Sequence, residues 1–168
     1  MERFDCMKEA IKQVLDQTVE RRISALVEEY EKTDSARKRF RNLVEELAVQ
    51  KEGNLCISYL RSSYITGSGL FQIAFYVEEP FIEAPTAWVF DDMGISQDKI
   101  VEDLKYLNEY LKERFIRISP GEVEEIRRSY MEALYQGCGV IFALLAQGWG
   151  REGVSVYFGE YMGDLEKL

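Results

Sequence analysis

The side chains with the most evident chemistry are a group of carboxylates in the middle of the chain. Residues 78–103 hold eight acids against one lysine, which gives this segment a net charge of −7. The eight acids are Glu78, Glu79, Glu83, Asp91, Asp92, Asp98, Glu102 and Asp103. Carboxylate oxygens are preferred ligands of hard cations such as Mg²⁺, and the same charges suit a basic protein surface. A third interpretation is a solvated surface, in which the acids after Ser96 complement the dipole of a helix that begins there.

Histidine is absent from the sequence, and this absence removes several kinds of active site. A Ser-His-Asp or Cys-His nucleophile and a His-ligated zinc site all require an imidazole. The acidic segment also lacks the ligand spacing of an EF-hand calcium loop. Neighbours in a strand point to opposite faces, so neither Glu78 with Glu79 nor Asp91 with Asp92 can act as an acid–base pair on one substrate. We therefore predict no catalytic residue, no metal ligand and no cofactor.

A shorter basic group precedes the acidic segment. Four cations lie within five residues, at Arg37, Lys38, Arg39 and Arg41. A helix distributes such neighbours around its surface, so they form no single stripe. Because the whole chain has a net charge of −9, binding to nucleic acid is not expected. Pairing with nearby acids such as Glu45 and Glu46, or a contact between two copies of the chain, accounts better for these cations.

Two glycine-rich segments resemble phosphate-binding loops only in composition. A phosphate loop needs a strand, then glycines, then the N-terminus of a helix. Thr66–Gly69 is followed by a strand-like run, and Gly148–Gly153 lacks the lysine and serine of such a loop. The first is predicted to be a turn and the second to be the end of a helix. Trp149 and Arg151, within the second segment, are of the types that anchor protein interfaces, and we predict a partner contact there.

The three cysteines favour a reduced compartment. Cys6, Cys56 and Cys138 lie far apart, in no CxxC spacing, and their odd number argues against a disulfide framework. Cys56 and Cys138 lie in apolar runs, where a free cysteine is usually a small, inert buried hydrophobe. The first twelve residues do not resemble a signal peptide, and the longest apolar run, Gly137–Ala146, is about half the length of a membrane span. We predict a cytoplasmic protein that does not bind a membrane.

The hydrophobic pattern predicts one domain over residues 1–168. Apolar residues recur at steps of three and four through residues 1–50, which predicts amphipathic helices. The pattern changes to alternation over residues 54–91, where three β-branched and aromatic runs predict an antiparallel meander with a hairpin turn at Thr66–Gly69. Residues 96–148 return to the helical period and predict two helices, the second opened by Ser119, Pro120 and Glu122. Residues 153–159 alternate and are a candidate last strand.

The expected fold is therefore α+β, with N-terminal amphipathic helices, a three- to four-stranded antiparallel meander sheet and two further helices, one of them largely buried. Eight aromatic residues fall in or near the sheet: Tyr59, Tyr64, Phe71, Phe75, Tyr76, Phe81, Trp88 and Phe90. Alternate residues of a strand face opposite sides, so helices that all pack on one side would leave an aromatic surface on the other. That surface is a candidate groove or dimer interface.

Together these patterns favour a non-enzymatic protein-binding or regulatory module. We expect a homo-oligomer and a protein partner with a basic surface, and we expect neither nucleic acid nor a membrane as partner. The residues predicted to contact the partner are Glu78, Glu79, Glu83, Asp91, Asp92, Trp149 and Arg151. The alternative is a carboxylate-based enzyme or small-ligand protein that binds a divalent metal through Glu78, Asp91 and Asp92.

Overall fold

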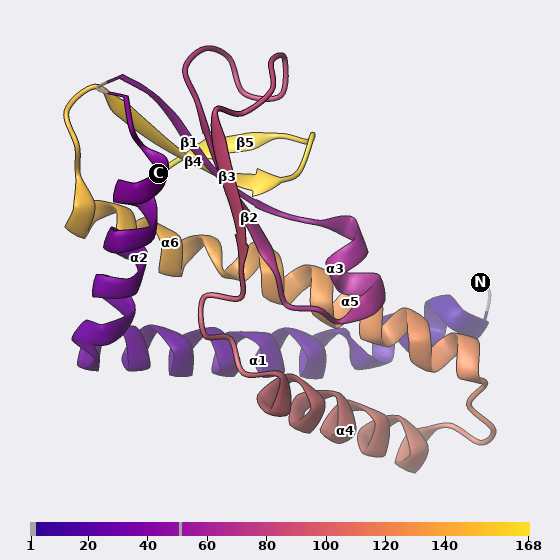
Figure 1. The fold of residues 1–168 in the computed structure, drawn as a ribbon. Coiled ribbons are helices and arrows are strands. Elements are labelled where there is room, and N and C mark those ends of the chain that lie inside the picture. The colour runs from indigo at the N-terminus through magenta and orange to yellow at the C-terminus, as the bar shows by residue number, and fades with distance from the viewer. Residues whose placement is uncertain (1–2, 51) are drawn as a thin grey trace.

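The computed structural model describes residues 3–50 and 52–168, and its architecture is α+β, as predicted. Two helices fill the N-terminal segment. α1 (Arg3–Lys32) and α2 (Asp34–Leu47) are separated by Thr33 alone, and α2 turns away steeply from the end of α1 (Figure 1). The helices expected from the periodicity of residues 1–50 are confirmed.

Five strands form one mixed sheet. They are β1 (Gly53–Tyr59), β2 (Phe71–Tyr76), β3 (Ala87–Asp91), β4 (Val154–Glu160) and β5 (Leu165–Lys167), in the spatial order β3-β2-β1-β4-β5. β1, β2 and β3 pair antiparallel, as predicted for the meander. β4 instead pairs parallel to β1, and β5 pairs antiparallel to β4. The prediction of a three- to four-stranded antiparallel sheet is wrong in this part, because the helices between β3 and β4 form a crossover that returns the chain parallel to β1.

A short helix, α3 (Arg61–Thr66), connects β1 to β2 where the sequence predicts a hairpin turn. Gly67 ends this helix in the left-handed conformation, with a φ of 68°, and its N–H donates to the Ser63 carbonyl at 2.8 Å. Glycine adopts this conformation without the steric cost that other residues meet. A helix of six residues shows too little periodicity to be recognised from sequence.

Three helices, rather than the predicted two, follow β3. They are α4 (Gln97–Arg114), α5 (Pro120–Gly137) and α6 (Gly139–Trp149). The predicted start of α5 is confirmed as a capping box, in which two orphan N–H groups are satisfied reciprocally. The Ser119 hydroxyl accepts from the Glu122 N–H at 3.3 Å, and the Glu122 carboxylate accepts from the Ser119 N–H at 2.7 Å.

The break between α5 and α6 falls at Cys138, between two glycines. A Cβ atom at Gly137 would lie 2.9 Å from Ile23 of α1. One at Gly139 would lie 3.0 Å from Phe158 of β4. Both distances are shorter than ordinary van der Waals contact. The missing side chains therefore let this part of the chain pass between α1 and the sheet.

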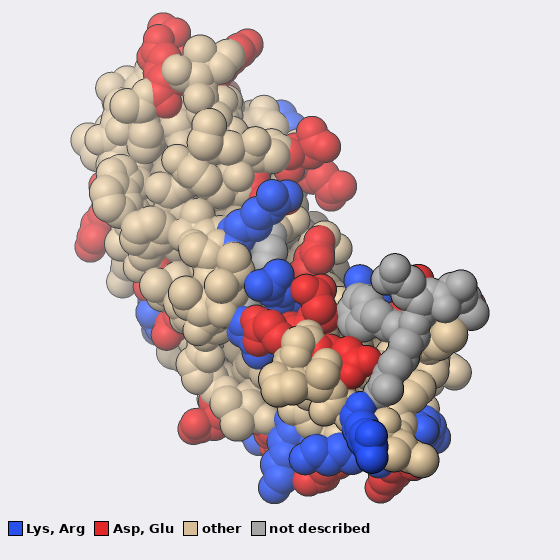
Figure 2. Space-filling model, turned by 90° about the vertical axis from the view of Figure 1, so that its right-hand side faces the viewer, with Lys and Arg blue, Asp and Glu red and all other residues tan. Residues whose placement is uncertain are grey.

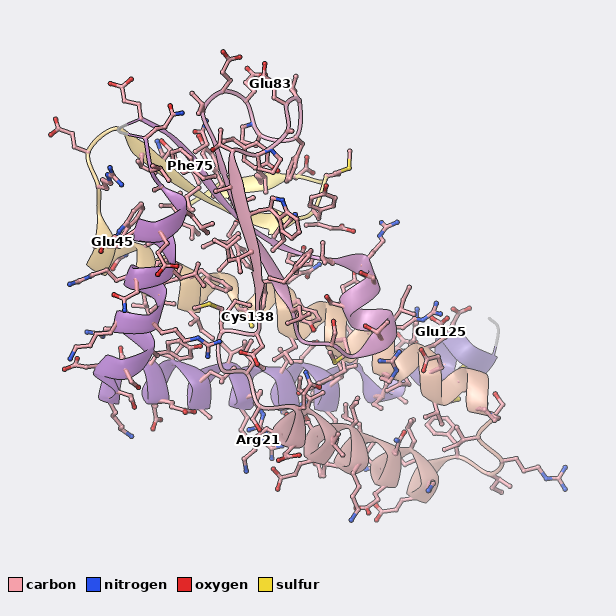
Figure 3. The ribbon with its side chains drawn as sticks, in the orientation of Figure 1. Arg21, Glu45, Phe75, Glu83, Glu125 and Cys138 are labelled. Carbon is pink, nitrogen blue, oxygen red and sulfur yellow. The ribbon has the colours of Figure 1, made fainter. Side chains whose placement is uncertain are left out.

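The main core lies between the helices and one face of the sheet. Its strand residues include Leu55, Ile57, Phe71, Ile73 and Phe75, all buried. Successive side chains of a strand point to opposite faces of the sheet, and these residues occupy alternate positions on the face that packs against the helices. Figure 3 shows Phe75 on the side of the sheet that faces α2. Among the described helices, none is long and apolar enough to cross a membrane.

Two of the cysteines are buried, as predicted. Cys138 belongs to the main core, and Cys56 lies on the opposite face of the sheet. Burial raises the pKa of each thiol to about 12, because the thiolate would lose its hydration. Both side chains are therefore protonated near neutral pH and unsuited to nucleophilic chemistry. Cys6 is exposed.

Candidate functional site

The fold divides the acidic segment between the two ends of β3. Glu78, Glu79 and Glu83 lie in the loop 77–86 that precedes this strand, and Figure 3 shows Glu83 at the tip of the loop, far from α1. Asp91 and Asp92 lie at the other end. The five residues of β3 separate the two groups by about 16 Å. Carboxylates this far apart cannot bind one cation, and the predicted contact residues do not form one surface.

The two aspartates at the end of β3 have intramolecular partners. The guanidinium of Arg39 in α2 donates to Asp91 at 2.8 Å and to Asp92 at 3.3 Å. Each carboxylate also accepts a backbone N–H from the turn that follows, Asp91 from Met93 at 2.7 Å and Asp92 from Gly94 at 2.8 Å. The hydrogen bond to Asp91 raises the pKa of Arg39. This cluster fastens α2 to the C-terminal end of β3.

Asp103 is a third structural carboxylate, and it is completely buried. Arg22 of α1 donates to it at 2.7 and 2.9 Å, Arg21 at 3.1 Å, and the Tyr130 hydroxyl of α5 at 2.6 Å. Burial raises the pKa of Asp103, but the hydrogen bonds from Arg22 and Tyr130 together outweigh it and hold the pKa below its usual value. Figure 3 shows Arg21 where α1 meets α4. Asp103 therefore joins three helices and is not part of an acidic surface.

The basic segment of α2 pairs with groups that are distant in sequence. Besides the contacts of Arg39, Arg41 donates to the Gly148 carbonyl at the end of α6, at 3.1 Å. The predicted pairing with Glu45 and Glu46 is therefore not the one that Arg39 and Arg41 make. Arg37 and Lys38 are exposed, and neither forms an ion pair with another described residue.

The predicted contact at Trp149 and Arg151 is also used within the chain. Arg151 donates to the Ala48 carbonyl at the end of α2, at 2.6 Å, where a positive charge complements the helix dipole. Trp149 is half-buried against the main core. Arg151 therefore links the segment after α6 to the end of α2, and Trp149 contributes to the packing of the core.

The three glutamates of the loop 77–86 are the predicted contact residues not yet described. Glu78, Glu79 and Glu83 are exposed, and within the part of the chain that the structure describes none of them has an ion pair. No group of three or more Cys, Asp or Glu side chains suited to a metal ion occurs among the described residues. The loop therefore presents three uncompensated negative charges at one end of β3.

The face of the sheet opposite the helices has a small core of its own, formed by Cys56, Ala74 and Tyr76. The loop 77–86 folds back over it. The Phe81 ring lies edge-on to Tyr76, with centroids 5.8 Å apart, and edge-on to Tyr161, with centroids 5.3 Å apart. The second face predicted from the aromatic pattern exists, and the loop covers part of it.

Two exposed aromatic residues of this face lie on β3. Trp88 and Phe90 are 55% and 41% exposed, and their rings meet at 67° with centroids 5.3 Å apart. Ala87 and Val89, which alternate with them, pack against the main core. Figure 2 shows a broad uncharged area in the upper part of the molecule, with acidic side chains at its top. We refer to Trp88 and Phe90 as the aromatic pair.

β3 is also an edge of the sheet. No described strand pairs with its outer side, so alternate N–H and C=O groups of Ala87–Asp91 point outward. Natural edge strands usually carry charges, proline or a bulge that discourage pairing with another chain. The residues Ala87 to Phe90 are four apolar residues in succession. The opposite edge, β5, carries Glu166 and Lys167. Of the two edges, β3 is the one suited to pairing.

The sequence alone does not single out the aromatic pair. Its one signal is the apolar run Ala87–Phe90, which is unusual for a strand with one solvated face. The apolar run indicates a binding edge only once β3 is known to lie at the edge of the sheet. That position is known only from the order of the strands in the structure.

Comparison of the chain with protein-family models, with curated proteins and with solved structures gave no match. The surface with the most distinctive chemistry is the edge of β3, with the aromatic pair on one face and the acidic loop at one end.

Proposed function

We propose that the protein is a non-enzymatic binding module that receives an extended polypeptide strand on the edge of β3. The observation that carries the proposal is an edge strand with four apolar residues in succession, Ala87–Phe90, two of which are exposed aromatic rings. In recognition by strand addition, main-chain hydrogen bonds supply affinity, and alternate side chains supply specificity. β3 offers both kinds of contact on one five-residue segment.

The aromatic pair supplies the apolar part of this interaction. Large aromatic side chains, tryptophan above all, are enriched among the residues that dominate interface energetics. Full burial of a large apolar side chain contributes about 1.5 to 3 kcal/mol relative to its exposed state. Trp88 and Phe90 are half-exposed, so a strand lying beside them would bury surface that water now contacts.

The acidic loop indicates the charge of the partner. Glu78, Glu79 and Glu83 lie at the N-terminal end of β3. A strand that pairs antiparallel to β3 would bring its own C-terminal end beside this loop. The partner that fits best therefore offers an apolar strand and a basic surface near the C-terminal end of that strand. This agrees with the basic partner expected from composition.

The alternative, a metal-dependent enzyme or small-ligand protein, has less support. Asp91 and Asp92 already accept hydrogen bonds from Arg39 and from backbone N–H groups. Glu78 lies at the other end of β3. The carboxylates on which that alternative depends are thus either occupied or apart.

The test is capture of polypeptides from an extract of the native host by three immobilised forms of the protein. The first is the wild type and the second carries Trp88→Lys and Phe90→Lys. The third, a matched control, carries Val101→Lys and Ile116→Lys, at two exposed apolar sites away from the sheet. We expect the wild type and the control to retain the same polypeptides and the β3 variant to lose them. Equal recovery by all three forms would contradict the proposal.

A further inference from the structure

We infer that the strand received by β3 is the β3 strand of a second copy of the chain, which makes the protein a two-fold dimer with a continuous sheet. The inference rests on the proposed function, because it names the occupant of the same edge. A two-fold contact requires a surface that is complementary to itself. β3 and the two segments at its ends meet this requirement in backbone, rings and charges.

The register follows from the geometry of antiparallel pairing. Two antiparallel copies of one strand place a single residue opposite itself. Val89 is the middle residue of β3, and with Val89 at the centre, Trp88 lies opposite Phe90 of the second copy. Both rings already share one face in each chain. Four rings would then meet across the new strand pair, at distances where cross-strand aromatic pairs stabilise a sheet.

The two ends of β3 differ in charge: one is purely acidic and the other combines acidic and basic side chains. The loop 77–86 at one end carries three glutamates and no cation. At the other end Arg39 brings the basic segment of α2 to Asp91 and Asp92. The four cations of residues 37–41 exceed these two carboxylates by two charges. Antiparallel pairing brings the acidic loop of each copy toward the basic segment of the other, which favours association of this chain with itself.

The loop adds apolar surface next to the strand. Ile82 is 75% exposed and Val77 is also exposed. Both lie in the segment that a second copy would approach when its own β3 pairs with this edge. The dimer would therefore cover apolar side chains on the loop as well as the aromatic pair, and contacts beyond a five-residue strand pair would support it.

Sedimentation equilibrium of the purified chain tests the inference first. We expect a monomer–dimer equilibrium for the wild type and for the control with Val101→Lys and Ile116→Lys, over concentrations from about 1 µM to about 1 mM. The variant with Trp88→Lys and Phe90→Lys is expected to stay monomeric. Circular dichroism verifies that each variant is folded. Because the aromatic pair is exposed, its replacement leaves the main core intact.

A charge exchange provides a second test that does not alter β3. One variant carries Glu78→Lys, Glu79→Lys and Glu83→Lys, and the other carries Arg37→Glu and Lys38→Glu. Each variant alone places like charges at both ends of the dimer, so we expect its dissociation constant to rise about tenfold or more. An equimolar mixture restores opposite charges at both ends and should form the mixed dimer in preference.

The outcomes separate this inference from the proposed function. If the wild type stays monomeric at every concentration while capture from the extract still depends on Trp88 and Phe90, the inferred dimer is wrong. The proposed binding function of β3 is then still supported. A dimer that persists in the β3 variant would overturn the inference by placing the contact elsewhere. Loss of both dimerisation and β3-dependent capture would overturn both proposals.

Discussion

Two groups among the carboxylates of residues 78–103 are used differently by the fold. Asp91 and Asp103 accept hydrogen bonds from arginines of α2 and α1, and both are shielded from water. Glu78, Glu79 and Glu83 are exposed in the loop beyond the helices. The difference shows that a carboxylate becomes structural where a helix brings an arginine to it. The three exposed glutamates at the N-terminal end of β3 are the charges that remain for a partner of this strand.

The largest expected effect comes from breaking the buried member of the first group. Asp103→Asn removes the buried counter-charge of Arg22, whose side chain is only 13% exposed, and leaves the exposed Glu102 at 3.9 Å as its ion-pair partner. We expect a loss of about 3 to 5 kcal/mol in the free energy of unfolding. Urea denaturation measures it. Asp98→Asn, at an exposed position of the same helix, is the control and should cost less than about 1 kcal/mol. Equal losses would contradict the assignment.

Acid should remove part of the same stabilisation in the unaltered protein. The pKa of Asp103 is lower in the folded chain than in the unfolded chain, where it is about 3.9. Its contribution is therefore complete above the unfolded value and is lost as the pH falls through the folded value. Denaturation between about pH 2 and pH 6 should show this decline in the wild type. The free energy of unfolding of Asp103→Asn should decline less over the same pH range. An equal decline in the wild type and in Asp103→Asn would contradict this role of Asp103.

At the end of β3 the effects should be smaller and graded by exposure. Asp91→Ala removes acceptors for Arg39 and for the Met93 N–H, and the Asp91 side chain is 13% exposed. We expect a loss of about 1 to 2 kcal/mol in the free energy of unfolding. Asp92 is 49% exposed, and Asp92→Ala should cost less than about 1 kcal/mol. A larger loss for Asp92→Ala than for Asp91→Ala in chemical denaturation would contradict this ranking by exposure.

The smallest effect on stability is expected from the second group. The triple variant Glu78→Gln, Glu79→Gln and Glu83→Gln should unfold within about 0.5 kcal/mol of the wild type, because these side chains are exposed and have no ion pair among the described residues. Denaturation is measured in dilute protein, where association does not contribute. A loss as large as that of Asp91→Ala would show that the loop acids are structural after all.

Local signals in the sequence predict local structure well. Ser119, Pro120 and Glu122 predict the start of α5, and the capping box has the geometry that these residue types require. The apolar runs around Cys56 and Cys138 predict their burial. The alternation of residues 153–159 predicts a strand but carries no information on its partner, so the parallel pairing of β4 with β1 could not be foreseen.

Long-range contacts account for what sequence could not show at the candidate site. The spacing of Asp103 from Ile100 and Leu107 places it on the buried face of α4, but its partner Arg22 is 81 residues away and no sequence signal connects the two. Likewise, the alternation of Trp88 and Phe90 predicts a common face but not an edge. Both properties depend on how helices and strands are ordered in space.

The most direct measurement of the central claim is hydrogen exchange of the β3 amides, resolved by NMR, below and above the dissociation constant of the dimer. Exchange reports whether an N–H group is hydrogen-bonded, and only the outward groups of an edge strand depend on association. We predict that alternate N–H groups of Ala87–Asp91 become protected as concentration rises, while those of β5 do not change. Exchange of the β3 amides at the same rate at every concentration would contradict the account.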